Sequence, residues 1–413
     1  MKNTTAHALQ AGRRDESTWL NAQSPAFRLM IATSWLAPES WQQHQEAAIR
    51  QACADGMDWA AYQRLVARHR TPALSWAALK RVPGIEIPQE AAEGLKAGSD
   101  ACRRLAMSHL PLLASMLKAL GKDEIPALSL KGPLLSLELY GDLGLRHSKD
   151  IDLEVPEKEI FRARDCLMNA GYRMDGVYAR LTPRQWQRFL QEEHSLDFLR
   201  PNGCLALELH WRHHWNMPGE THDQWASSIP SVWQGFAYRT LHPIDQVLYL
   251  CSHGAMHLWF RAKWLGDLAR IHAAGNIDWA LALEKAQMTR QERPLLAALV
   301  LLEALYALPR PSLPGDPWRT LSNKLVDEPL CSLAREEDFM TIGTAQWVSH
   351  RYRAIRYDLL LLPHKSLRRR LAELIYSRED YIQFPLPDRF FWAYTPLRPF
   401  FWLLRRMRPR RVH

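Results

Sequence analysis

The chain has 413 residues, of which 47% are hydrophobic and 23% are charged, a balance that excludes an intrinsically disordered protein. Its length exceeds that of a single packed core and predicts two or three packed units. The 53 basic and 44 acidic residues give a net charge of +9, which favours an anionic partner without choosing between nucleic acid and a membrane surface.

The cysteines and the hydropathy of the chain indicate its compartment and whether it crosses a membrane. Six cysteines are scattered along the chain without a Cys-x-x-Cys pair, which indicates reduced, mostly buried thiols and predicts a cytoplasmic protein. Residues 1–14 lack the apolar centre of a signal peptide. The sequence contains no run of roughly 18 apolar residues, so it predicts no membrane-spanning segment.

The pattern of residues along the chain predicts five regions and an α+β fold, in which a small mixed sheet is flanked by helical regions. These are a loose N-terminus at 1–25, a helical region at 26–120, a core at 121–215, a helical region at 216–325, and a C-terminal helical region with a basic tail at 326–413.

The helical regions show apolar residues at helical spacing. The N-terminal region contains a long helical pattern over residues 88–120, after a break at Pro83-Gly84. After residue 215 the pattern again predicts helix, most strongly over residues 243–274.

The pattern of the core region instead predicts short strands and helices that follow one another along the chain. In chain order, these are a strand at 125–130, a turn at 131–133, a helix to residue 140, a strand at 149–155, a helix at 157–170, and strands at 195–199 and 204–211 around an Asn-Gly turn.

The strand at 149–155 carries acidic residues at alternate positions. Successive side chains of a strand point to opposite faces, so Asp150, Asp152 and Glu154 are expected to share one face. Neighbouring carboxylates about 6–7 Å apart repel by roughly 2 kcal/mol per pair, and a divalent cation converts this repulsion into attraction. Taken alone, the alternation favours a strand with a solvated acidic face, and the flanking residues shift the balance toward a metal site.

Two neighbouring segments add to this pattern. In the later strand, Glu208 and His210 alternate with leucines, so Glu208 would join the aspartate pair if the two strands lie side by side. Upstream, Lys131-Gly132 opens a helix, where a glycine lets backbone amides approach phosphate. Lys131 or Arg146 could add a charged contact to a triphosphate. For a lone Lys-Gly, an ordinary turn is the favoured interpretation.

Several spaced motifs now stand in a defined order: Leu130-Lys131-Gly132, Tyr140-Gly141-Asp142, Arg146, Asp150-Ile151-Asp152-Leu153 and Glu208-Leu209-His210-Trp211. As a set they resemble the uncharacterised nucleotidyltransferase family within the DNA polymerase beta-like superfamily. The similarity continues through His253, His257, Lys263-Trp264-Leu265 and Asp267, and covers roughly residues 65–275.

The resemblance implies transfer of a nucleoside monophosphate group from a nucleoside triphosphate to an acceptor, with release of pyrophosphate. Asp150, Asp152 and Glu208 would be the catalytic residues and would hold Mg²⁺ or Mn²⁺. Lys131, Gly132 and Arg146 would bind the nucleotide. Two features depart from the superfamily pattern, because Lys131-Gly132 replaces Gly-Ser and the third acid is Glu208 instead of the commoner Asp.

Residues outside this set extend the hypothesis. His210, His253, His257 and Asp267 could line a cleft for the substrate. His253 and His257 are four residues apart, a spacing that can also hold zinc, but Gly254 follows His253 where a zinc protease motif has glutamate. Helix packing explains the two histidines more simply.

The C-terminal tail combines aromatic residues at 390–392 and 400–402 with arginines 405, 406, 408, 410 and 411. This combination suits peripheral contact with an anionic membrane, which would place the protein at the inner face of the membrane. Packing of the aromatic residues against the main body is favoured, because Pro396 and Pro399 interrupt a long amphipathic helix. Nucleic acid is a further possible partner.

Two rival functions remain open from the sequence. The departures at Lys131-Gly132 and Glu208 also suit a nucleotidyltransferase fold that has lost turnover and serves as a binding or regulatory module. A zinc hydrolase would use His253, His257 and Asp267 and would carry stoichiometric zinc. The acceptor, the preferred nucleotide and the oligomeric state are not readable from the sequence.

Overall fold

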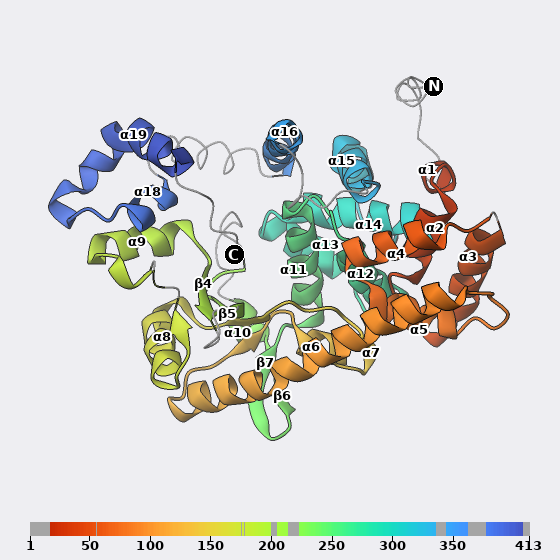
Figure 1. Ribbon diagram of the computed structural model, residues 1–413, viewed down its shortest axis with the longest axis horizontal. Coiled ribbons are helices and arrows are strands. Elements are labelled where there is room, and N and C mark those ends of the chain that lie inside the picture. Colours follow the sequence, from red (N-terminus) through yellow and green to blue (C-terminus); the bar gives the residue numbers. More distant parts are fainter. Residues whose placement is uncertain are drawn as a thin grey trace.

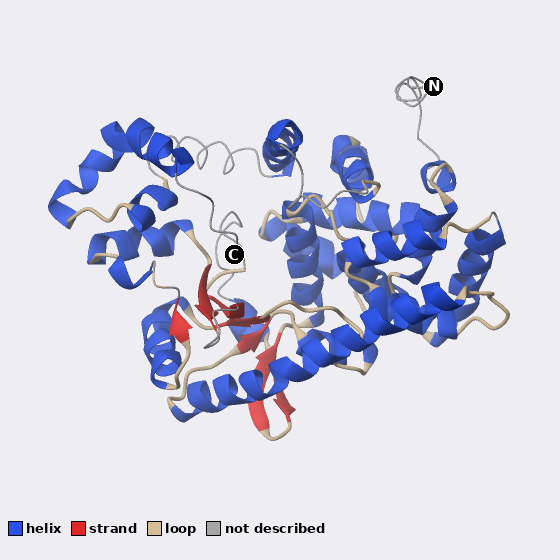
Figure 2. Cartoon of the chain, viewed as in Figure 1, coloured by secondary structure: helices blue, strands red, loops and turns tan. Residues whose placement is uncertain are grey.

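The structure is a computed structural model that describes residues 17–54, 56–174, 176, 178–199, 205–213, 223–335, 344–361 and 377–407. It has the expected α+β architecture, with helices around one mixed seven-stranded sheet (Figures 1 and 2). The predicted Asn-Gly turn after residue 200 and the arginines beyond Met407 lie outside the described residues.

The helices before the sheet lie on one side of the molecule, except that the last and longest of them extends past the sheet (Figure 1). They are α1 (Ser17–Asn21), α2 (Pro25–Thr33), α3 (Gln42–Ala54), α4 (Trp59–His69), α5 (Pro72–Lys80) and the 34-residue α6 (Gln89–Lys122), with the short 3-10 helix η1 (Glu39–Trp41). The helix α1 lies within the N-terminal stretch that the polar sequence led us to expect as loose.

The sheet consists of β1 (Leu128–Ser129), β2 (Ile151–Glu154), β3 (Arg173–Met174), β4 (Ser195–Leu199), β5 (Leu205–His210), β6 (Ile229–Trp233) and β7 (Phe236–Thr240). The strand order is β3-β4-β5-β2-β1-β7-β6. The central strand β2 is parallel to β5 and antiparallel to β1.

Helices and turns within this part are α7 (Pro133–Tyr140), η2 (Glu157–Glu159), α8 (Ile160–Asn169), η3 (Tyr178–Arg180), α9 (Pro183–Glu192) and α10 (Asp223–Ser227). After the sheet come α11 (Pro243–Met256), α12 (Ala262–Ala274), α13 (Trp279–Met288), α14 (Glu292–Tyr306), η4 (Pro317–Thr320), α15 (Lys324–Leu333) and α16 (Thr344–Leu361). The last elements are α18 (Arg378–Gln383), η5 (Asp388–Ala393) and α19 (Tyr394–Met407).

Two hydrophobic clusters explain this arrangement. The first joins the N-terminal helices to α11, α12 and α14, and the second joins the sheet to α8, α9 and the C-terminal helices. The helix α6 belongs to both, because Leu95 lies in the first cluster while Leu113 and Leu120 lie in the second. Figure 1 shows α6 running from the N-terminal helices past the sheet to α8. In the described part of the chain, no helix is long and apolar enough to cross a membrane.

One expectation for the region after residue 215 was wrong. Residues 229–240 form the hairpin β6–β7 instead of helix, because the turn Gln234-Gly235 has φ angles of 48° and 84° that reverse the chain tightly. The helical pattern predicted over 243–274 is confirmed, and it comprises two helices, α11 and α12, separated where Leu258 and Trp259 adopt positive φ angles of 53° and 51°.

The cysteines in the described part agree with the expected reduced state. Five of them are free, and three of these, Cys102, Cys166 and Cys251, are buried.

Gly266 allows α12 to pack directly on the end of α2. A Cβ atom at this position would lie 2.3 Å from the backbone oxygen of Ser34. We therefore expect Gly266→Ala to lower the free energy of unfolding by about 1–3 kcal/mol, since the two helices would have to separate. Chemical denaturation measures this value.

Gly121 near the end of α6 is the matched control, because a Cβ atom there meets nothing within 4 Å. Gly121→Ala should leave stability unchanged or raise it by up to about 1 kcal/mol, as a helical glycine replaced by alanine does. If the two variants change the free energy of unfolding by the same amount, the close contact between α2 and α12 is contradicted.

His69 at the end of α4 is fully buried beside the start of α12. Its Nδ1 atom accepts a hydrogen bond from the Ala262 amide at 3.0 Å, and the Arg68 guanidinium lies 2.9 Å from its Nε2 atom. Burial first, and then the charge of Arg68, hold the pKa of His69 well below its usual 6.5. The ring is therefore neutral in the folded protein at neutral pH.

This histidine should make folding sensitive to acid. Below about pH 6.5 the unfolded chain takes up a proton at His69 that the folded chain does not, so the free energy of unfolding falls as the pH falls, by up to about 1.4 kcal/mol per pH unit. His69→Gln should remove this contribution. Urea unfolding of both proteins between about pH 8 and pH 5 measures the two slopes, and equal slopes would contradict the assignment.

Candidate functional site: acidic residues on adjacent parallel strands

The two strands that carry the predicted acidic residues lie side by side. In the parallel register of β2 and β5, Asp152 is opposite Glu208, and Glu154 is opposite His210. The alternating leucines point the other way, and Leu153 and Leu209 are fully buried in the sheet core. Strand alternation therefore places the polar side chains of both strands on one face.

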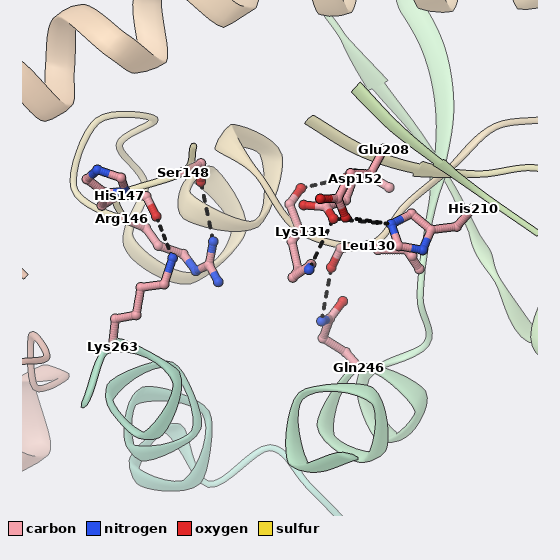
Figure 3. Close-up of polar contacts among 11 residues, drawn as sticks. Leu130, Lys131, Arg146, His147, Ser148, Asp152, Glu208, His210, Gln246 and Lys263 are labelled. Carbon is pink, nitrogen blue, oxygen red and sulfur yellow. Dashed lines mark hydrogen bonds and ion pairs between the residues drawn. The ribbon is translucent and has the colours of Figure 1, made fainter. Parts of the chain in front are cut away.

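Three of these side chains converge into a group that could hold a metal ion. One ligand atom each from Asp152, Glu208 and His210 lies within 4.8 Å of the others. The His210 Nε2 atom is 3.3 Å from Asp152 Oδ1 and 3.6 Å from Glu208 Oε2 (Figure 3). Asp152 and His210 are buried, whereas the Glu208 side chain is 30% exposed and gives access to the group.

The charges of this group are strongly coupled. Burial alone would lower the pKa of His210, but its contacts with Asp152 and Glu208 outweigh burial and raise the pKa to about 9. Burial opposes ionisation of Asp152 as well, yet the neighbouring Lys131 and His210 hold the pKa of Asp152 well below its usual range. Asp152 is therefore ionised between two cationic partners.

Lys131 reaches the group from the turn between β1 and α7. Its Nζ atom is 3.1 Å from Asp152 Oδ1, and its side chain is only 12% exposed (Figure 3). The same ammonium lies 5.9 Å from the centre of the Tyr249 ring on α11. Burial would lower the pKa of Lys131, but the Asp152 carboxylate raises it, so the lysine stays charged.

Gly132 is required where the chain enters α7. It has φ 86° and ψ −158°, a conformation reserved for glycine, and it immediately precedes Pro133 at the first position of the helix. Its Cα faces the start of β2, since an added Cβ atom would lie 3.7 Å from the backbone oxygen of Asp150. The glycine turn and the acidic strand are thus direct neighbours.

Asp150 differs from the expectation drawn from strand alternation. The regular strand β2 begins at Ile151, so Asp150 lies in the preceding bend. Among the described residues, the metal-ligand group contains His210 as its third member and does not contain Asp150. Burial first, and then the charges of Asp152 and Glu208, raise the pKa of Asp150 to about 6. Asp150 therefore lies near enough to both carboxylates to interact with them.

Arg146 and Asp267 come together in a buried ion pair. The Arg146 Nε atom donates to Asp267 Oδ2 at 2.8 Å, and the two side chains are 2% and 0% exposed. The Tyr140 hydroxyl donates to the other carboxylate oxygen at 3.3 Å. Lys263, also on α12, donates to the backbone oxygen of His147 at 3.0 Å (Figure 3). These contacts hold the loop that leads to Asp150 against α12.

His253 and His257 form part of an aromatic cluster on α11 and α12. Their ring centres are 4.8 Å apart, and His257 stacks on Trp264 with the ring centres 5.3 Å apart. Burial first, and then Lys131, lower the pKa of His257 to about 4. Within the described ranges, no group of potential metal ligands includes these histidines, and Asp267 is engaged by Arg146 instead.

Sequence reasoning predicted His253 and His257 but missed two other residues of α11. Gln246 donates to the backbone oxygen of Leu130 at 3.4 Å, and Tyr249 contacts Lys131. The spacing of Gln246, Tyr249 and His253 places them on one face of a helix, and this periodicity was the available signal.

The fold and the site define a class of protein: acidic residues on adjacent strands of a small mixed sheet, beside a glycine turn that opens a helix. The chain belongs to the uncharacterised nucleotidyltransferase family, to which it is similar over residues 55–307. The match extends from α4 to α14, further in both directions than the sequence motifs. No curated protein and no solved structure matches the chain.

The ion pair between Arg146 and Asp267 leads to a prediction about stability. Asp267→Asn removes one partner of a fully buried pair and leaves the guanidinium without a counter-charge. We expect the free energy of unfolding to fall by about 3–5 kcal/mol. Denaturant titration followed by circular dichroism measures the loss.

The matched control is Glu46→Gln, which breaks the surface pair with Arg50 on α3, where both side chains are more than a third exposed. Its cost should stay below about 1 kcal/mol. A loss of similar size in both variants would show that the pair with Asp267 does not support the loop.

Proposed function

We propose that the protein transfers a nucleoside monophosphate group from a nucleoside triphosphate to an acceptor and releases pyrophosphate. The observation that carries this proposal is the register of β2 and β5, which brings Asp152 and Glu208 together beside Gly132. Membership in a nucleotidyltransferase family supports the same reaction class.

The residues present fit a divalent cation. Asp152 and Glu208 offer carboxylate oxygens, which Mg²⁺ and Mn²⁺ prefer, and Asp150 adds a third carboxylate from the adjoining bend. His210 either supplies a nitrogen ligand or orients both carboxylates through its Nε2 atom. When bound, a divalent cation neutralises triphosphate oxygens and polarises the phosphorus under attack.

The chain's own residues would then act as follows. The amides at Gly132 and the start of α7 bind the β- and γ-phosphates, and Lys131 supplies a positive charge beside them. Glu208, the most exposed acid of the group, accepts the proton of the acceptor hydroxyl. The acceptor oxygen forms a bond to the α-phosphorus while the bond from that phosphorus to the pyrophosphate oxygen breaks.

Other predicted residues act around this centre. Arg146 is engaged with Asp267, which suits a role in holding the loop before Asp150, and a direct contact of Arg146 with the triphosphate stays a prediction. His253 and His257 would line a substrate cleft on the α11 side, where the neutral ring of His257 suits stacking or hydrogen bonding to a substrate.

One observation favours a second candidate, a binding or regulatory module without turnover. Lys131 and protonated His210 balance the two carboxylates of Asp152 and Glu208 without any metal ion. A bound cation must therefore displace a proton from His210 or shift Lys131, which would weaken metal binding.

The decisive experiment separates binding from turnover. We expect metal-dependent binding of a nucleoside triphosphate to the wild-type protein, and a loss of affinity in Asp152→Asn/Glu208→Gln larger than the about 10–100-fold typical of outer-shell changes. Calorimetric titration of each nucleotide with Mg²⁺ or Mn²⁺ measures this. Asp165→Asn on α8, where the side chain is 58% exposed, is the control and should bind as the wild type does.

Pyrophosphate release decides between the two candidates. Release that requires Asp152 and Glu208, measured across sugar, nucleotide and protein acceptors, supports the transferase. Metal-dependent binding without release across those acceptors supports the binding module. If the double variant binds nucleotide as well as the wild type, both proposals are removed.

A further inference from the structure

The outward side of α19 carries a stripe of large apolar side chains. Leu397, Phe400 and Leu403 are spaced three residues apart and are 40%, 55% and 50% exposed. The opposite side of the helix is anchored, because Tyr394 and Phe401 are buried in the cluster around the sheet. The helix is therefore held in place with an apolar face turned to solvent.

The turn before α19 extends this face. Phe390 and Trp392 in η5 are 43% and 64% exposed, and Trp402 is 47% exposed. Six of the fourteen large hydrophobic side chains that are exposed in the described ranges therefore fall within residues 390–403. We call these six residues the α19 surface: Phe390, Trp392, Leu397, Phe400, Trp402 and Leu403. Figure 1 shows α18 and α19 at the end of the molecule away from the N-terminal helices.

The sequence expectation for these aromatics was half right. Phe391 and Phe401 pack against the body as favoured, with the Phe401 ring stacked on Phe384 at 4.9 Å between ring centres. Phe390, Trp392 and Phe400 do not, because their neighbours in the chain already occupy the inward positions.

The sequence that carries the α19 surface is strongly basic. Residues 388–413 contain seven arginines and one acidic residue, Asp388. Arg398 and Arg405 fix α19 to α18 through Asp380, at 3.4 and 3.1 Å. Arg389 is exposed and lies 4.8 Å from the centre of the Phe390 ring.

The other four of these seven arginines are residues 406, 408, 410 and 411 of the sequence. A basic cluster of this size at the end of an amphipathic helix is typical of binding to anionic lipid. Tryptophan, phenylalanine and leucine are the side chains that such helices place at the boundary between headgroups and acyl chains.

We propose that the α19 surface docks on an anionic phospholipid bilayer. The helix lies parallel to the membrane plane, and the stripe of Leu397, Phe400 and Leu403 enters the headgroup boundary. The arginines that are not paired with Asp380 contact lipid phosphates. The mode is peripheral, since none of the described helices is long and apolar enough to cross a bilayer. The docking does not depend on the proposed transfer reaction, because the α19 surface shares no residue with the acidic site.

Vesicle flotation of the full chain tests the proposal. We expect binding to vesicles of phosphatidylcholine mixed with phosphatidylglycerol, and weak or no binding to phosphatidylcholine alone. Phe400→Ser/Leu403→Ser should reduce the affinity at least tenfold, as expected for two lost apolar side chains. Arg408→Gln/Arg410→Gln/Arg411→Gln should reduce it by about fivefold per charge. Raising the salt concentration should weaken binding further.

Matched controls distinguish binding through the α19 surface from nonspecific binding through other exposed apolar or basic residues. Val232→Ser/Met288→Ser removes two apolar side chains that are 68% and 79% exposed elsewhere. Lys96→Gln/Arg104→Gln/Lys118→Gln removes three exposed charges from α6. Both controls should bind vesicles as the wild type does.

Three outcomes would overturn the proposal. The first is no binding of the wild type to the anionic vesicles, and the second is unchanged binding of Phe400→Ser/Leu403→Ser. The third is a dimer, seen by analytical ultracentrifugation without lipid, that the same double variant converts to monomer. In that case a second copy of the chain covers the α19 surface.

Discussion

The structure of the site follows from the need to hold one buried carboxylate. Asp152 lies in the central strand, almost without access to solvent, and it remains ionised because Lys131 and His210 lie on either side of it. An ionised carboxylate costs several kcal/mol to bury without partners. The strand pairing of β2 with β5, the turn before α7 and the face of α11 that carries Tyr249 all contribute to this balance of charge.

The helical region after the sheet is part of the site in a physical sense. Arg146 and Asp267 tie the loop before β2 to α12, and Lys263 adds a bond to the same loop. The position of Asp150 at the end of this loop thus depends on a helix more than a hundred residues further along the chain. The region similar to the family, which runs to residue 307, includes this helix.

Part of this arrangement could be predicted from the sequence, and the reason lies in strand geometry. Alternation correctly placed Asp152, Glu208 and His210 on one face, because a strand has a fixed period of two. The role of Asp150 was harder to predict, since a strand boundary that shifts by one residue removes it from that period. The pairing of Arg146 with Asp267 joins residues far apart in sequence, and no local pattern encodes such a contact. The hairpin β6–β7 was missed because Gln234-Gly235 is a less familiar turn pair than Asn-Gly.

The helix α6 has a consequence for how the molecule can be divided. Its first half contributes Leu95 to the helical cluster, and its second half contributes Leu113 and Leu120 to the cluster around the sheet. A fragment that begins at the strands would therefore expose the apolar surface that α6 normally covers. A fragment that ends before the strands would keep all of α6, but the second half of this helix would have nothing to pack against. Because α6 belongs to both clusters, the two clusters should unfold in a single cooperative transition instead of as separate domains.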